Sequence, residues 1–227
     1  LVIVRFYILI FSKVSDANIR IYHYEDSVNS NHYPHTITEN RTWVSKGVDA
    51  VELEIERYSE SLIMRSQNRG MNFLRVDSKL SSNNYTVIRK NNKLHISGVF
   101  EGNPIQDIVR IDKLPWVNAP GILLRDFILS NEKKHIFWII STKTLRPIKM
   151  KLSKQGNELI QYKGETVLVQ QLRLSPASIL GLFWKAYLWA DLKTGSVLKY
   201  QGPNTERNSG PKSDLIMTLE DEYIKQK

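Results

Sequence analysis

The 227-residue sequence contains no cysteine. Without a thiol, the chain can form no disulfide scaffold, no thiolate zinc site and no iron–sulfur cluster, and it has no cysteine nucleophile. It also lacks the GxSxG, GxxxxGK(S/T) and GxGxxG patterns, which excludes the common hydrolase, P-loop and dinucleotide-binding classes. These absences predict a protein that needs no cofactor and carries no catalytic motif, so we expect that it is not an enzyme.

The sequence is also poor in long apolar runs. The run LVIVRFYILIF at residues 1–11 is too short to cross a bilayer as a helix, which takes about 20 residues, and no later run is longer. Ser15 and Ala17 are small residues two positions apart, as signal-peptidase sites require. We interpret residues 1–17 as a signal peptide and residues 18–227 as a single β-rich domain, periplasmic or secreted and not transmembrane. A buried first strand is the alternative.

The charge balance is basic, with a net charge of +9 and an isoelectric point of about 9.6. A nucleic acid, an anionic membrane surface or an acidic ligand could each account for such a charge. The 32 lysines and arginines are spread along the chain, mostly one or two at a time, and form no five-residue block. This distribution favours a solvated surface, and we predict no nucleic-acid partner.

Short alternating runs dominate the rest of the chain. Val51, Leu53 and Ile55 alternate with three glutamates, and a period of two is typical of a half-buried strand. Similar runs recur between turn clusters, including those at residues 90–93 and 155–157. The pattern predicts a mainly β fold, namely a single curved antiparallel sheet that forms a meander and closes part-way into an open or half-closed barrel.

One helix is predicted at residues 121–130 (GILLRDFILS), where four apolar residues recur at helical spacing and Asn131 can cap the end. Strand residues that are adjacent in sequence point to opposite faces of a sheet. The pairs Phe137–Trp138 and Phe183–Trp184 therefore put aromatic groups on both faces, and we expect Phe137 or Trp138 to be deeply buried. Both faces then need cover, from the helix or from a lipid-like ligand.

Two residue sets were weighed for chemistry. His23, His32 and His35 lie close together but lack the fixed spacing of a metal site, so a polar loop is the preferred interpretation and no metal is predicted. The SxxK pattern that begins at Ser130 and the KTG pattern at 193–195 are typical of penicillin-recognising enzymes. Here Ser130 ends the predicted helix instead of opening one, and KTG falls in a turn, so we interpret both as coincidence.

Residues 112–203 resemble a group of uncharacterised bacterial periplasmic proteins. The likeness is carried by LPWVNAPGILLRDFILSN, HIFWIISTKTLRPIKMKL, GNELIQYKGETVLVQQLRLS and WKAYLWADLKTGSVLKYQGP. That group is similar in architecture to lipoprotein carriers of the Lol type, in which a long antiparallel sheet forms a half-barrel over a helix. The resemblance implies a fold and a ligand class, and it brings no catalytic residue.

We therefore expect a non-enzymatic periplasmic binding or carrier protein for an apolar or envelope-derived ligand, such as a lipid or acyl chain. An envelope structural or interaction protein with a protein partner and no small ligand is the alternative. A hydrolase acting on envelope polymers is a third hypothesis, and it has the least support from the sequence. The candidate cavity residues are Trp116, Ile122, Leu123, Phe127, Ile128, Trp138 and Trp184.

Overall fold

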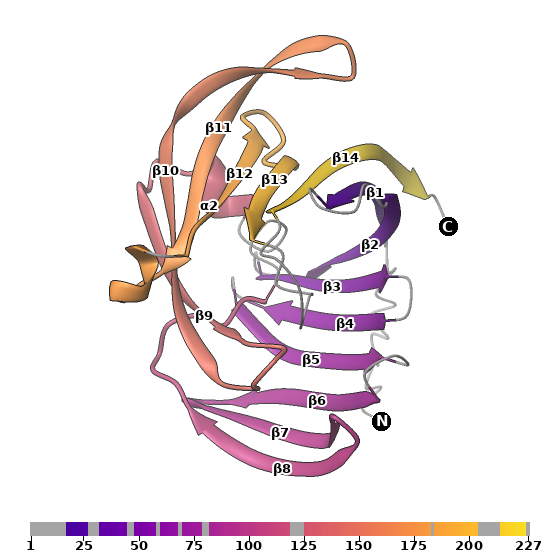
Figure 1. Cartoon of the computed structure of the whole chain (residues 1–227), viewed down its shortest axis with the longest axis vertical. Helices are drawn as coiled ribbons and strands as arrows, with labels where there is room; N and C mark the ends of the chain where they lie inside the picture. Colours follow the sequence, from indigo (N-terminus) through magenta and orange to yellow (C-terminus); the bar gives the residue numbers. More distant parts are fainter. Residues whose placement is uncertain are drawn as a thin grey trace, which may run out of the picture.

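A computed structural model of the chain describes residues 17–26, 32–44, 48–57, 60–67, 70–78, 82–118, 125–182, 184–203 and 214–225 (Figure 1). Residues 1–16, which make up nearly all of the expected signal peptide, lie outside the described residues, as do Ile122 and Leu123 of the expected helix. The division into a signal peptide and one domain therefore stays a prediction.

In the described residues, fourteen strands form one antiparallel sheet in which strands that follow one another in the chain lie side by side, except β8 and β9. The strands are β1 (Ala17–Asp26), β2 (His32–Val44), β3 (Val48–Arg57), β4 (Glu60–Gln67), β5 (Gly70–Ser78), β6 (Asn83–Lys90), β7 (Lys93–Phe100), β8 (Asn103–Arg110), β9 (Lys134–Ile140), β10 (Pro147–Tyr162), β11 (Glu165–Pro176), β12 (Ala186–Asp191), β13 (Val197–Pro203) and β14 (Asp214–Lys225). The predicted curved antiparallel meander is confirmed.

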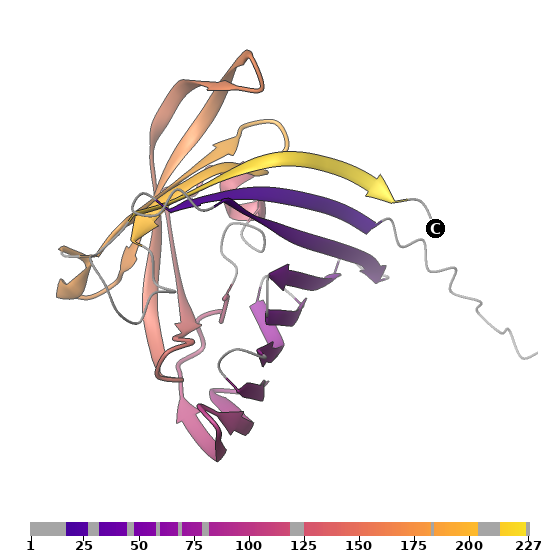
Figure 2. The ribbon, with the colours of Figure 1, turned by 45° about the vertical axis from the view of Figure 1, so that its right-hand side comes forward.

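The sheet has two arms and is not closed. β1–β8 form the first arm and β9–β14 the second, and pairing of β1 with β14 joins them. β8 and β9 are the two ends of the sheet although they follow one another in the chain. The arms curve toward each other in Figures 1 and 2. The half-closed barrel that the sequence predicts is the observed architecture.

Alternation of buried and exposed residues accounts for the strands. In β6, Tyr85 and Val87 are buried and Ile88 is exposed, as expected of a strand with one face on a core. The turn that follows is the one predicted at residues 90–93, and Asn91 adopts a φ of 56° there. Asparagine tolerates this left-handed conformation better than most residues, so the local sequence fixes this hairpin.

Two strand boundaries differ from the sequence-based expectation. The loop predicted around His32 and His35 is instead the start of β2, where Pro34 pairs only with β1, since the pairing with β3 begins at Thr36. Proline lacks an amide hydrogen and is tolerated where a strand has one neighbour. The histidines therefore belong to a strand and not to a polar loop.

The turn predicted at residues 155–157 is wrong. β10 runs without interruption from Pro147 to Tyr162 and forms a long hairpin with β11. Lys154 pairs with Leu172 and Gly156 with Gln171, so Gln155 is an extra residue. A β-bulge absorbs one extra residue without ending the strand, and Gly156 is compatible with that irregularity.

Two apolar clusters pack on opposite faces of the second arm. The first cluster joins side chains of both arms, among them Leu74 and Ile140. The second cluster lies on the other face of the second arm. Phe137 is completely buried in the second cluster, whereas its neighbour Trp138 packs against the first. This confirms that Phe137 is deeply buried and that the second arm is apolar on both faces.

The helix α2 (Arg125–Leu129) covers the second cluster with Phe127 and Ile128, which are 4% and 2% exposed. It is shorter than the predicted 121–130, and residues 121–124 lie outside the described residues. A 3-10 helix, η1 (Ile179–Leu182), also follows β11, and the sequence analysis did not anticipate it. The single α-helix described confirms the predicted fold class.

Candidate functional site

A hollow of about 280 Å³ opens where α2 ends against the β10–β11 hairpin. Ile128, Leu129 and Leu192 form its apolar part. Its polar part is formed by Ser130, Asn131, Lys154, Asn157 and Gln170. Lys154 is the one charged side chain of this lining, so the hollow combines an apolar wall with a single cation.

The place of α2 depends on a glycine in the turn between β12 and β13. Gly195 has a φ of 68°, and a Cβ there would lie 2.8 Å from Cγ of Arg125 and 3.1 Å from Cγ of Leu129. Asp191 fixes the same turn, because its carboxylate accepts the backbone N–H of Thr194 at 2.7 Å. A glycine in this conformation lets α2 lie directly on the turn, and the end of α2 then forms one wall of the hollow.

The ammonium group of Lys154 lies at the hollow, and its contacts are with uncharged groups. Its ammonium group donates to the carbonyl oxygen of Ser130 and lies 5.2 Å from the centre of the Phe127 ring. Burial lowers the pKa of Lys154, and the nearby carboxylate of Glu132 acts in the opposite direction. The ammonium group can therefore accept a further anionic partner without first breaking an ion pair.

Beyond the hollow, the hairpin carries an exposed pair of leucines. Leu159 of β10 and Leu168 of β11 are register partners and are 66% and 50% exposed. The flanking pairs on this face are Asn157 with Gln170 and Gln161 with Thr166. All six side chains are uncharged. Since residues two apart along a strand are about 7 Å apart, the leucine pair lies next to the lining of the hollow.

The opposite face of the same hairpin is anchored. Ile160 and Val167 are register partners that pack against the first cluster. The hydroxyl of Tyr162 donates to the carbonyl oxygen of Leu219 in β14 at 2.8 Å. The hairpin is therefore held on one face while its leucine pair points away on the other.

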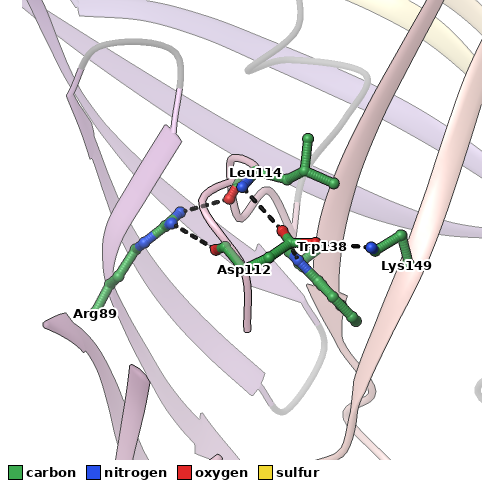
Figure 3. A network of polar contacts seen from close by, with 5 residues as sticks. All are labelled: Arg89, Asp112, Leu114, Trp138 and Lys149. Atoms are coloured by element: carbon green, nitrogen blue, oxygen red, sulfur yellow. Dashed lines mark hydrogen bonds and ion pairs between the residues drawn. The ribbon is translucent and has the colours of Figure 1, made fainter. Parts of the chain in front are cut away.

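A polar network fixes the chain where it leaves β8 (Figure 3). The carboxylate of Asp112 accepts hydrogen bonds from Nζ of Lys149 and Nε1 of Trp138, both at 2.7 Å, and from the Leu114 backbone at 3.0 Å. The bonds from Lys149 and Trp138 lower the pKa of Asp112 from 3.8 to about 2. Arg89 donates to the carbonyl oxygens of Leu114 and Asp112 at 2.9 and 3.2 Å. The network ties β6 to β9 and β10.

The segment after this network crosses between the two arms. Trp116 and Trp138 form a parallel bridge in which the Val117 amide donates to Trp138 at 2.7 Å. On its other side, the Trp116 carbonyl oxygen accepts the Met71 amide of β5 at 2.7 Å. Asn118 accepts from Nε1 of Trp116 at 2.6 Å. The LPW segment is thus a strut between β5 and β9, and its polar groups are satisfied within the protein.

The structure divides the predicted cavity residues between the two clusters. Phe127, Ile128 and Trp184 belong to or pack against the second cluster. Trp116 and Trp138 belong to or pack against the first, on the other face of the sheet. Of the predicted residues that the structure describes, Ile128 alone lines the hollow described above, while Ile122 and Leu123 lie outside the described residues. A cavity shared by all of the predicted residues stays a prediction.

Sequence reasoning missed Lys154 and the leucine pair. Within GNELIQY, Leu159 and Ile160 are apolar at adjacent positions, so the alternation does not tell which of them faces the core. Only the register of the hairpin, with its bulge at Gln155, assigns Ile160 to the first cluster and Leu159 to the exposed face.

The patterns weighed for chemistry find no support in the described geometry. The hydroxyl of Ser130 donates to the Phe127 carbonyl at 2.8 Å and accepts the Glu132 amide at 3.1 Å, so it caps α2. Among the residues whose side chains the structure describes, which do not include His23, His32 and His35, no three His, Asp or Glu side chains gather as a metal site would require. The same residues include no helix long and apolar enough to span a membrane.

Comparisons with known proteins show a likeness of fold. No protein-family model matches the chain, and no curated protein is similar to it. A β-barrel-like protein of the domain of unknown function DUF1849 from Brucella abortus aligns with a TM-score of 0.53 at 6% identity, over 93% of this chain and 99% of that one. At this identity the likeness concerns the fold alone. It confirms the predicted resemblance to an uncharacterised bacterial β-sheet family at that level.

Two further solved structures align more weakly. The hypothetical lipoprotein YmcC from Escherichia coli has a TM-score of 0.29 at 15% identity, over 90% of this chain and 85% of that one. An outer membrane lipoprotein-sorting protein domain from Vibrio parahaemolyticus has a TM-score of 0.32 at 11% identity, over 92% of this chain and 85% of that one. Both TM-scores are below the level that establishes a shared fold.

Proposed function

We propose that the chain is a non-enzymatic binding or carrier protein of the bacterial envelope, and that its ligand is apolar, such as an acyl chain or another envelope-derived molecule. The observation that carries the proposal is the leucine pair, Leu159 and Leu168, which extends the hollow along an uncharged and exposed face. The resemblance of the sequence to Lol-type lipoprotein carriers leads to the same ligand class.

The hollow suits the two ends of an amphiphile. An acyl chain lying over the leucine pair would gain up to about 0.8 kcal/mol for each methylene that it buries, offset by the entropy lost on binding. An anionic head group would meet the ammonium group of Lys154, whose present partners are a carbonyl oxygen and an aromatic ring. We therefore expect a fatty acid to bind in the micromolar range and more tightly than the uncharged alcohol of the same length.

The test is a titration of the delipidated full chain with cis-parinaric acid, a fluorescent fatty acid. The variant Leu159→Ser with Leu168→Ser should weaken binding at least about fivefold, because it removes the apolar contact without touching a buried side chain. The matched control carries Ile88→Ser and Ile108→Ser, two residues that are exposed on the first arm. It should bind cis-parinaric acid as tightly as the unmodified chain does. Absence of binding by the unmodified chain, or equal losses in both variants, would contradict the proposal.

A second candidate is an envelope interaction protein without a small ligand. It is favoured by the exposure of the leucine pair, at 66% and 50%, on the outward face of an anchored hairpin, where a partner protein could cover it. If lipid-free protein binds no fatty acid, and the double serine variant instead fails to cross-link to an envelope protein that the unmodified chain contacts, this candidate replaces the first.

We further propose that the protein is exported, because the apolar run at 1–11 precedes the small residues Ser15 and Ala17. N-terminal sequencing of natively produced protein should find a mature form that begins near Asn18. A form in the cytosolic fraction that retains residues 1–17 would contradict export.

A further inference from the structure

Basic side chains gather on the face of the second arm that carries the first cluster. They are Lys134, Lys149, Lys151, Arg173, Lys185 and Lys199, here called the basic strip. The register places them together: Lys134 pairs with Ser153, Ser153 with Arg173, and Arg173 with Tyr187. Lys149 and Lys151 are two residues apart on β10 and therefore share this face. The strip crosses β9–β13 (Figure 1).

Aromatic rings hold three of these ammonium groups in place. Nζ of Lys149 lies 4.8 Å from the centre of the Trp138 ring, and Nζ of Lys199 lies 5.0 Å from that of Trp189. Nζ of Lys185 lies 5.9 Å from the Tyr187 ring. Cation–π contacts of this kind fix a long side chain without neutralising its charge. The three aromatic rings thus hold the lysine ammonium groups in position, and the lysine side chains cover the ring faces.

The charge of the basic strip is not balanced locally. Lys149 pairs with Asp112 at 2.7 Å, and among the described residues no carboxylate is within ion-pair distance of the other five. The nearby carboxylate of Glu158 accepts the indole N–H of Trp189. On the opposite face of β9–β13, the strand residues that the structure describes include one lysine, Lys154, and no arginine. A merely solvated surface would mix both signs, so the segregation points to an anionic partner.

We propose that the basic strip binds a linear acidic polymer, one that carries carboxylate or phosphate groups along an extended chain. Five strands spaced about 4.8 Å apart make the strip roughly 20 Å wide, which suits several repeating charges. Four of the six basic side chains are half-buried and two are exposed. Because most of these charges lie below the surrounding surface, a narrow extended polymer can reach them more easily than a flat bilayer can. Because lysines already cover the rings, nucleobases find no free ring on which to stack.

This binding surface goes beyond the apolar site, which lies on the opposite face of the sheet. Sequence reasoning did not find it because its members are spread from residue 134 to residue 199, and only the strand register brings them together. The position of Arg173 is fixed by a hydrogen bond from its Nη2 to the Gly181 carbonyl oxygen at 3.2 Å.

The experiment measures binding of the full chain to polygalacturonate, with uncharged dextran as the polymer control. The strip variant carries Lys151→Gln, Lys185→Gln and Lys199→Gln. The control variant changes the net charge equally through Arg75→Gln, Lys90→Gln and Lys93→Gln, all exposed and on the first arm. Circular dichroism confirms that each variant is folded.

The strip variant should lose at least about tenfold in affinity for polygalacturonate and show a weaker salt dependence, while the control variant loses less than about twofold. No binding by the unmodified chain, or equal losses in the two variants, would overturn the proposal. Tighter binding of anionic vesicles or of an oligo-thymidine, with the same dependence on the strip, would assign the surface to a membrane or a nucleic acid instead. None of these results bears on fatty-acid binding at the leucine pair.

Discussion

Replacing Phe137 by alanine tests the two-faced construction of the second arm. Phe137 is 0% exposed, faces Met150 across the β9–β10 ladder and stacks 6.1 Å from the ring of His135. The second cluster around it is covered by α2. Truncation of a fully buried phenylalanine removes its transfer free energy and leaves a cavity, which together cost about 3–5 kcal/mol.

Urea denaturation gives this cost directly. If the free energy of unfolding falls by about 2–3 kcal/mol per molar urea, the urea concentration at the unfolding midpoint should be about 1–2 M lower for Phe137→Ala than for the unmodified chain. The neighbouring Ile136, 40% exposed on the other face, is the matched control, and Ile136→Ala should cost less than about 1 kcal/mol. Equal costs for the two variants, or a cost below about 1 kcal/mol for Phe137→Ala, would refute the argument that the second face is a buried core.

Three further predictions concern the connections and the site. Asp112→Asn should lower the free energy of unfolding by less than about 1 kcal/mol at neutral pH, since the group is partly exposed. Because folding lowers the pKa of Asp112 from 3.8 to about 2, the difference should vanish as the pH falls through this interval, measured by urea titration at each pH. Gly195→Ala should cost about 1–3 kcal/mol by thermal denaturation, because φ is 68° and α2 occupies the space of the added Cβ. Asn118→Ala should cost about 1–3 kcal/mol in the same assay, since it leaves the Ile140 amide, bonded at 2.9 Å, without its partner. An unchanged stability of Gly195→Ala or Asn118→Ala would count against the contact concerned, as would a loss in Asp112→Asn that does not depend on pH.

The sequence predicted the strands because the alternation of apolar residues is local. Val51, Leu53 and Ile55 alternate with glutamates in the middle of β3. Asn91 and Asn92 lie in the turn between β6 and β7. The same local reasoning failed at Gln155, where glycine and asparagine suggest a turn but the chain continues through a bulge. Whether such residues end a strand depends on the partner strand, which the local sequence does not contain.

The features on which the proposed binding sites rest depend on strand register and on contacts between residues far apart in the chain. Trp116 was predicted as a cavity residue, but its carbonyl oxygen accepts a hydrogen bond from the Met71 amide, which joins segments 45 residues apart in the chain. The exposure of Leu159 follows from pairing with Leu168 and from the anchoring of Tyr162 on β14. Similarly, the lysines and aromatic rings of the basic strip are ordinary in sequence and become a surface only when five strands align.

Native mass spectrometry of the protein purified from the cells that naturally produce it tests directly whether the chain carries an apolar ligand. The account predicts that a fraction of the unmodified chain carries a lipid or another acyl-containing molecule, and that this adduct is much reduced in the Leu159→Ser and Leu168→Ser variant while the chain remains folded. Unmodified protein that is free of any apolar adduct, under conditions that preserve the adducts of a known fatty-acid-binding protein, would contradict the claim.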